Sequence, residues 1–207
     1  MDLETFLDII QQMVGAKGPD PILYQYFHQL LDKRTVIFNR EVNEDVVEMV
    51  YLPLKEFEDD ESDEPVTLIL NSFGGSVSDG FFLAHYLSQY KKKLNILVTG
   101  YAASMAAIIL CGGGKNPNVT RSCYPSTYGL IHDGYVALNP SESKTASDIM
   151  AFNESVDQDI RQFILENTNI TPEQYDSKTR HQWFLTAKEM KELNLIDVII
   201  GESGDNK

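Results

Sequence analysis

One serine stands in the middle of a small, apolar stretch of the sequence, GYAASMAAIILCGGG (Gly100–Gly114). Ser104 comes after a run that predicts a buried strand and before a run that predicts a buried helix. At such a turn the free N–H groups of the first helical turn can stabilise an oxyanion, so Ser104 could be a nucleophile. The pattern also fits a packed serine whose hydroxyl bonds to a carbonyl one turn back.

A nucleophilic serine needs a base, and His132 is the best placed of the four histidines. It ends a short apolar run, YGLI, and precedes a glycine-bearing loop, so it can reach into a site from a strand terminus. It comes 28 residues after Ser104, which in an alternating α/β chain means adjacent elements. His28 and His85 lie in helical patterns and are interpreted as ordinary histidines.

A glycine-rich turn, NSFGGSV (Asn71–Val77), follows another apolar run. Two adjacent glycines permit backbone angles at which N–H groups point toward a ligand. The pair fits an ordinary tight turn as well. The G-x-x-x-x-G-K-[ST] pattern of a phosphate loop does not occur here.

Apolar and amphipathic runs alternate along the chain of 207 residues. Short apolar runs predict strands, and apolar residues recurring at three and four predict helices. The alternation predicts an α/β fold with a largely parallel sheet, and GGGKNPNVTRSCYPST is predicted to be a loop. Thr186 is predicted to begin the last helix, with Glu189 as its capping-box partner. The predicted strands are TVIFN, VTLILNS, LNILVTG, YGLIHDG and a final run at LIDVII.

Three segments are predicted along the chain. Residues 1–33 form an N-terminal helical arm, residues 34–200 form the main domain, and residues 201–207 form a frayed C-terminal tail. The acidic N-terminus does not fit a signal peptide, and no apolar run reaches the roughly 18 residues of a membrane span. We therefore expect a cytoplasmic protein with no membrane partner.

The charge and cysteine content limit the partners. The formal net charge of −14 argues against nucleic acid, because phosphate contacts need clusters of lysine and arginine. The one compact basic run, Lys91–Lys93, fits a solvated turn. Cys111 and Cys123 match no zinc signature and are interpreted as reduced thiols, so no metal site is predicted.

Four motifs in this order, NSFGGSVSDG, GYAASMAA, YGLIHDG and FLTAKEMKELNLIDVII, resemble the ClpP family of proteolytic subunits of ATP-dependent Clp proteases. The resemblance covers about Arg34 to Ile200. It implies a serine endopeptidase with the crotonase-like ββα-spiral fold and a protruding handle helix from about Lys144 to Asn167. Ser104 then corresponds to the nucleophile and His132 to the general base.

The resemblance also implies the rest of the site and the partners. The backbone N–H groups of Gly75 and Met105 would form the oxyanion hole, and Ser76 and Val77 would pair with an extended peptide substrate. Unfolded polypeptides would be degraded inside a homo-oligomer of two stacked heptameric rings. A hexameric AAA+ Clp unfoldase would feed the chamber and use the ATP, so this chain needs no cofactor.

The third member of the triad departs from the family pattern. The family has an aspartate just before the FLTA segment, and counting without gaps puts Gln182 there. A glutamine can accept a hydrogen bond from the histidine but cannot stabilise the imidazolium as a charge would. Asp176 lies six residues upstream, and a shifted alignment would place His181 at this position. The alternative function is therefore a catalytically impaired structural subunit of a mixed ring; a crotonase-like acyl-CoA enzyme is a third hypothesis.

Overall fold

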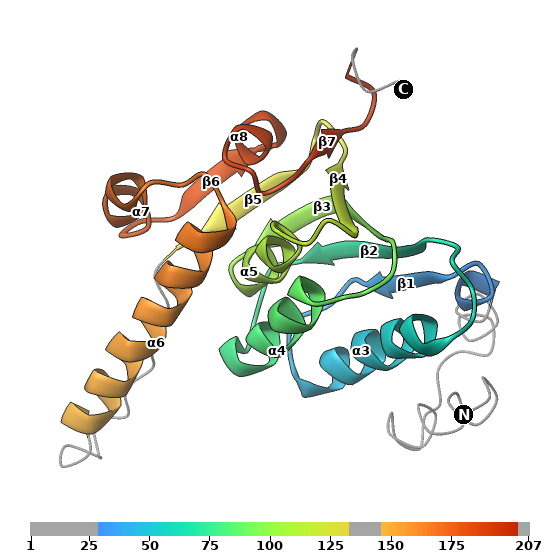
Figure 1. Cartoon of the computed structure of the whole chain (residues 1–207). Helices are drawn as coiled ribbons and strands as arrows, with labels where there is room; N and C mark the ends of the chain where they lie inside the picture. Colours follow the sequence, from blue (N-terminus) through green and yellow to red (C-terminus); the bar gives the residue numbers. More distant parts are fainter. Residues whose placement is uncertain (1–28, 133–145, 203–207) are drawn as a thin grey trace.

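The computed structural model describes residues 29–132 and 146–202, and these residues form a seven-stranded sheet with helices packed against it (Figure 1). The main path runs β1-β2-β3-β4-β7, and every pairing along it is parallel. β5 pairs with β3 in parallel, and β6 pairs with β5 antiparallel. The predicted α/β architecture with a largely parallel sheet is confirmed. The strands are β1 (Thr35–Phe38), β2 (Val66–Ser72), β3 (Leu94–Ala103), β4 (Val119–Cys123), β5 (Tyr128–Ile131), β6 (Trp183–Thr186) and β7 (Val198–Ile199).

Three helices cover one face of the sheet, as Figure 1 shows for α3, α4 and α5. Strand β2 has alternating burial, with Val66, Leu68 and Leu70 fully enclosed under these helices. The residues between them are only partly buried, which is typical of a sheet with one well-covered face. The helices are α3 (Glu44–Asp59), α4 (Val77–Ser88), α5 (Met105–Gly112), α6 (Ala146–Asn167), α7 (Pro172–Lys178) and α8 (Ala187–Glu192).

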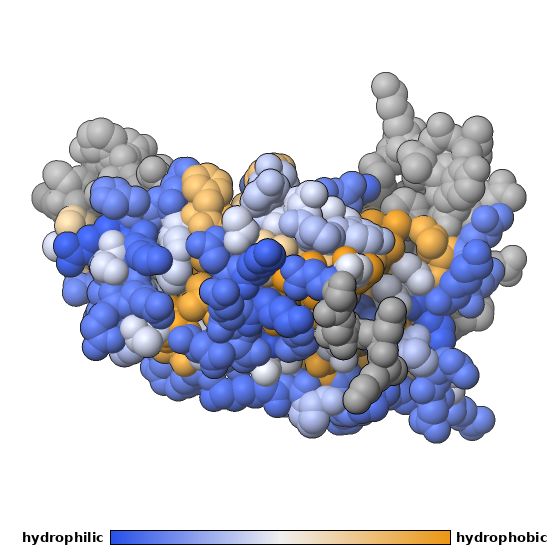
Figure 2. Space-filling model, turned by 90° about the horizontal axis from the view of Figure 1, so that it is seen from above, coloured by the Kyte–Doolittle hydropathy of each residue, from blue (hydrophilic) through white to orange (hydrophobic). Residues whose placement is uncertain are grey.

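Three exposed aromatic rings form a row: Phe73 just after the end of β2, Tyr101 on β3 and Tyr128 on β5. The rings of Phe73 and Tyr101 have centroids 4.7 Å apart, and those of Tyr101 and Tyr128 are 5.9 Å apart. Phe73 is 71% exposed. Seen from above, the molecule has hydrophobic patches between hydrophilic areas (Figure 2).

Strand β4 corrects the prediction of a long loop after α5. It lies between β3 and β7, although its sequence, VTRSC, looks polar. Arg121 is 1% exposed because its guanidinium donates to Asp197 Oδ1 and Oδ2 and to Asn194 O and Oδ1. These partners lie more than 70 residues away, so the local sequence gives no sign that this arginine is buried.

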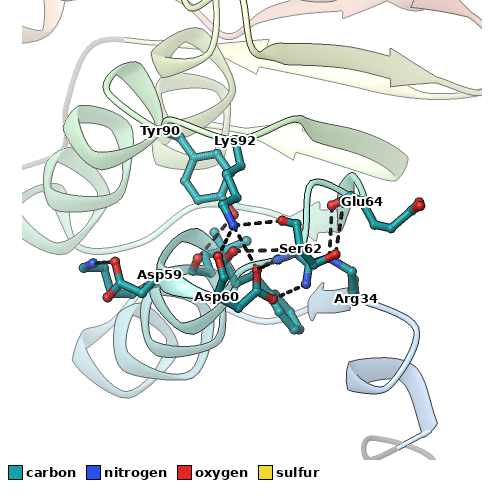
Figure 3. A network of polar contacts seen from close by, with 10 residues as sticks. Arg34, Asp59, Asp60, Ser62, Glu64, Tyr90 and Lys92 are labelled. Carbon is teal, nitrogen blue, oxygen red and sulfur yellow. Dashed lines mark hydrogen bonds and ion pairs between the residues drawn. The ribbon is translucent and has the colours of Figure 1, made fainter.

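The acidic loop after α3 is held by two cations (Figure 3). Asp60 binds the Arg34 guanidinium, and Lys92 Nζ donates to Asp60 Oδ1 at 2.9 Å and to Ser62 O at 2.8 Å. Arg34 Nε also donates to Glu64 O at 3.0 Å. Burial acts to raise the pKa of Asp60, but the hydrogen bonds from Arg34 and Lys92 outweigh it and lower this pKa.

Helix α6 extends away from the sheet at its N-terminal end (Figure 1). Its C-terminal half is fixed to the domain, because Arg161 forms two hydrogen bonds with Asp176 of α7 and Phe163 packs edge-on against Phe81 of α4. The predicted capping box at the start of α8 is confirmed. Within the described residues, no helix is long and apolar enough to cross a membrane.

The predicted segment boundaries at residues 33 and 200 stay predictions. Residues 1–28 of the predicted arm and 203–207 of the predicted tail lie outside the described residues. The same is true of residues 133–145, where the long helix was predicted to begin.

Candidate active site

Ser104 occupies a sharp turn between the end of β3 and the start of α5. Its backbone has φ 54° and ψ −126°, a conformation that L-residues adopt rarely and at a cost of about 1–3 kcal/mol. Ser104 N–H donates to Leu130 O of β5 at 2.8 Å, which ties the turn to the neighbouring strand. The side chain makes no capping bond to α5, so its hydroxyl is available for other contacts.

His132 follows β5 directly and meets this hydroxyl. Its Nε2 lies 3.0 Å from Ser104 Oγ, a hydrogen-bond distance. Strand β5 runs parallel to β3 with Leu130 opposite Ala103, so both residues emerge at the same edge of the sheet. The structure therefore brings together the serine and the histidine that the sequence analysis paired, while their chemical roles stay predictions.

The glycine turn lies against the start of α5. A Cβ added at Gly74 would lie 2.7 Å from Ser104 Cβ and 2.8 Å from Met105 N, so only a glycine allows this close approach. Gly74 has φ 98° and Gly75 has φ 148°, within the region that favours glycine. Val42 N–H donates to Gly74 O at 2.8 Å and holds the turn from its other side.

The two predicted oxyanion donors lie on these two segments. Met105 is the first residue of α5, so its N–H is one of the four that have no intrahelical acceptor. Gly75 stands opposite Val42 in an isolated bridge, and both Gly75 and Met105 line the same cleft as Ser104. The arrangement can direct two N–H groups toward a charge that develops beside Ser104 Oγ.

The two predicted peptide-binding residues differ in what their backbones already bind. Ser76 N–H donates to Val42 O at 2.8 Å, and its carbonyl accepts from Gly80 N–H at 3.0 Å. Val77 is the first residue of α4, so its N–H has no intrahelical acceptor. Val77 is therefore better placed than Ser76 to pair with a substrate strand, and both assignments stay predictions.

Gln182 is exposed and comes just before β6. The antiparallel pairing of β5 with β6 places Ile131 opposite Trp183, and one further step in this register places His132 opposite Gln182. Residues directly opposite on antiparallel strands have Cβ atoms about 4.5–5.5 Å apart. The alternative Asp176 lies in α7, where its carboxylate binds Arg161 and its pKa is lowered by that bond. His181 is exposed.

A cleft of about 710 Å³ opens beside the serine–histidine pair. Helices α4 and α5 form one side of the cleft, and α6 forms the other. Most of the side chains that these helices contribute to the lining are apolar. Its lining includes two carboxylates, Asp157 and Asp159, that the sequence analysis did not single out. The pattern Phe152, Val156 and Ile160 on α6 could have indicated an apolar helix face, but not the cleft that it borders. The full lining is Gly75, Val77, Ser78, Phe81, Ser104, Met105, Ile108, Ile131, His132, Phe152, Asn153, Val156, Asp157, Asp159 and Ile160.

Cys111 and Cys123 are buried free thiols, and burial raises the pKa of Cys111 to about 12 and that of Cys123 to about 11. Both therefore stay protonated near neutral pH. In residues 29–132 and 146–202, no group of three or more histidine, cysteine, aspartate or glutamate side chains could hold a metal ion.

The fold and the site together define an α/β protein with the serine–histidine arrangement found in serine hydrolases. The chain belongs to the Clp protease family, whose model matches residues 18–203. It is 27% identical to the ATP-dependent Clp protease proteolytic subunit 1 of Shouchella clausii over 180 residues, 86% of this chain and 90% of that protein. A solved structure of a ClpP1 mutant from Listeria monocytogenes matches with a TM-score of 0.69 and 26% identity. That match covers 84% of this chain and 95% of the other, and the resemblance to the ClpP fold is confirmed.

Proposed function

We propose that this Clp-type peptidase hydrolyses peptide bonds with Ser104 as nucleophile and His132 as general base. The observation that carries the proposal is the 3.0 Å separation of Ser104 Oγ and His132 Nε2. In the proposed reaction, Ser104 Oγ–H donates its proton to His132 Nε2 as Oγ attacks the scissile carbonyl carbon. His132 then gives that proton to the leaving amine, and a water molecule hydrolyses the acyl-enzyme by the same route.

The negative charge of the tetrahedral intermediate falls on the carbonyl oxygen. Backbone N–H groups of Gly75 and Met105 would donate to that oxyanion, and the strained turn at Ser104 keeps Oγ beside them. An extended substrate would add a strand next to the segment after Gly75, with Val77 N–H as a donor. No metal or cofactor enters this scheme.

The family membership supports a wider proposal about the assembly. We propose that the chain forms a homo-oligomer of two stacked heptameric rings in the cytoplasm and degrades unfolded polypeptides inside the chamber. The Shouchella clausii relative is described as a proteolytic subunit of an ATP-dependent protease. An AAA+ Clp unfoldase partner would supply the ATP-dependent step for this chain as well.

The proposal is tested by covalent labelling of the assembled protein. A fluorophosphonate should label wild-type protein at Ser104, and Ser104→Ala should abolish labelling. Ser88→Ala is the matched control, because Ser88 lies at the far end of α4 and donates to His85 O instead. Labelling that persists in Ser104→Ala would refute the assignment.

Gln182 motivates the alternative of a structural subunit. Rings that assemble but neither label nor cleave a small fluorogenic peptide would favour this alternative over the peptidase.

A further inference from the structure

The side chain of Asn71 joins strand β2 to the elements on both sides of it, just before the glycine turn. Its Oδ1 accepts from Tyr101 N–H of β3 at 2.8 Å, and its Nδ2 donates to Asn39 Oδ1, directly after β1, at 2.7 Å. A backbone N–H can only donate, so the carboxamide must present its oxygen to Tyr101 and its NH₂ group to Asn39. The side chain therefore has one defined orientation, fixed from two elements.

This carboxamide lies at an irregularity in the sheet. The register of β2 with β3 shifts between Leu70 and Ser72, so that two steps along β2 (70 to 72) match four steps along β3 (98 to 102). Asn71 is the β2 residue inside the shift, and its side chain supplies the acceptor for Tyr101 N–H. Bulges of this kind change where the following residues point. Since β3 ends directly before Ser104, the shift determines where that serine lies relative to the turn that follows β2.

Gly100 leaves the space that the carboxamide occupies. A Cβ added at Gly100 would lie 2.5 Å from Asn71 Oδ1 and 3.3 Å from Asn71 Cγ, and the three nearest atoms all belong to Asn71. Gly100 does not have a positive φ, so this position needs a glycine for space and not for its backbone conformation.

The two partners of the carboxamide belong to the segments that hold the glycine turn and the serine. Asn39 begins the connection that contains Val42, whose N–H donates to Gly74 O at 2.8 Å. On the other side, Tyr101 lies three residues before the serine of the turn into α5. Loss of the carboxamide would therefore let the glycine turn shift relative to that serine.

We propose that Asn71 is a positioning residue for the oxyanion hole, which it aligns by joining the segments that carry the N–H groups of Gly75 and Met105. Asn71 does not line the cleft beside Ser104, so it acts through the backbone and not on the substrate. This inference rests on the proposed peptidase function of the same site.

The expected loss of activity follows from what the oxyanion donors contribute. Removing one donor costs about 10²- to 10³-fold in kcat, and a misplacement of about 1 Å can cost about 100-fold. Asn71→Ala should therefore lower kcat by about 10- to 100-fold. KM should change by less than about 3-fold, because the donors act on charge that develops only in the transition state.

The test compares hydrolysis of a fluorogenic peptide with inhibition by a peptide boronate in the assembled wild type, Asn71→Ala and Asn118→Ala. The boronate forms a tetrahedral adduct on the serine, so its Ki should rise in Asn71→Ala by the factor by which kcat/KM falls. A variant that is only less stable has a smaller folded fraction, but its folded molecules bind the boronate as tightly as wild type does.

Asn118→Ala is the matched control. Asn118 is half-buried like Asn71, and its Nδ2 donates to Lys91 O at 3.0 Å. Its carbonyl accepts from Leu94 N–H at the start of β3, so it lies at the opposite end of that strand from Ser104. This variant should keep the wild-type kcat and Ki.

Gly100→Ala gives an independent check, because it adds a methyl group where the carboxamide lies. Alone it should lower kcat in the same way, and in the Asn71→Ala background it should cost little more, because the atoms it would meet are gone. Unchanged kcat and Ki in Asn71→Ala, an equal loss in Asn118→Ala, or effects of Asn71→Ala and Gly100→Ala that multiply would each overturn the proposal. Wild type that neither reacts with a fluorophosphonate at Ser104 nor cleaves the peptide would overturn the peptidase function as well, whereas an active wild type with any of these outcomes overturns this inference alone.

Discussion

Replacing Gln182 with glutamate should make the site a faster peptidase. The register of β5 with β6 pairs Ile131 with Trp183, and extending it by one residue places Gln182 opposite His132. Gln182→Glu adds a charge there without changing the length of the side chain. A carboxylate at that position would stabilise the imidazolium that forms while Ser104 attacks. Glutamine can only accept a hydrogen bond.

The expected increase in the reaction rate of Gln182→Glu follows from Coulomb's law. Opposite charges 4 Å apart interact by about 1 kcal/mol in water and by about 4 kcal/mol at the effective dielectric of a protein surface. Gln182 is exposed and His132 is partly buried, so the value should lie between these limits. A transition state stabilised by about 1.4–2.8 kcal/mol reacts about 10- to 100-fold faster.

The assay is hydrolysis of a fluorogenic peptide by wild type, Gln182→Glu and Gln158→Glu. Gln158 is an exposed residue of α6 outside the catalytic cleft, so the control makes the same substitution without approaching His132. We expect kcat/KM to rise in Gln182→Glu alone. The acid limb of its pH–rate profile should also move to higher pH, because a nearby carboxylate favours the protonated imidazole. Equal rates and profiles in all three proteins would refute the placement of residue 182 beside His132.

Two glycines of neighbouring helices should respond differently to alanine. A Cβ at Gly80 would lie 2.4 Å from Met105 Cε, the flexible end of a side chain, so Gly80→Ala should change the free energy of unfolding by less than about 1 kcal/mol. A Cβ at Gly112 would lie 2.3 Å from the backbone oxygen of Ala84, so Gly112→Ala should lower the free energy of unfolding by about 1–3 kcal/mol. Equal losses in the two variants, measured by urea unfolding, would contradict this. Folding lowers the pKa of Asp60 from its usual 3.8, so its stabilisation is present above about pH 4 and is lost as the pH falls through the lowered value. Asp60→Asn should therefore be less stable than wild type by about 1 kcal/mol at pH 7, and this difference in unfolding free energy should shrink toward pH 3. Urea unfolding at several pH values measures it, and a difference that stays constant would contradict the ionic role.

The elements that position Ser104 and His132 could be predicted from the sequence because their signals are local. Strand β2 has the bounds that its apolar run predicts, and the capping box of Thr186 and Glu189 is present as expected. The 28-residue separation of Ser104 and His132 corresponds to one helix and one further strand before β5. The serine and the histidine meet because β5 then pairs with β3, the strand that ends at the serine.

The features that escaped prediction depend on contacts between distant residues. Strand β4 looks like a polar loop because its central residue is Arg121, and burial of that residue depends on Asp197, 76 positions later. Asp157 and Asp159 look like ordinary solvated charges, and only the packing of α6 against α5 shows that they border the cleft of Ser104. Sequence periodicity identifies the buried face of a helix but not the element that it faces. For this chain the motifs therefore indicate the chemistry of the site, whereas the wall that α6 adds to the cleft depends on how the helices pack.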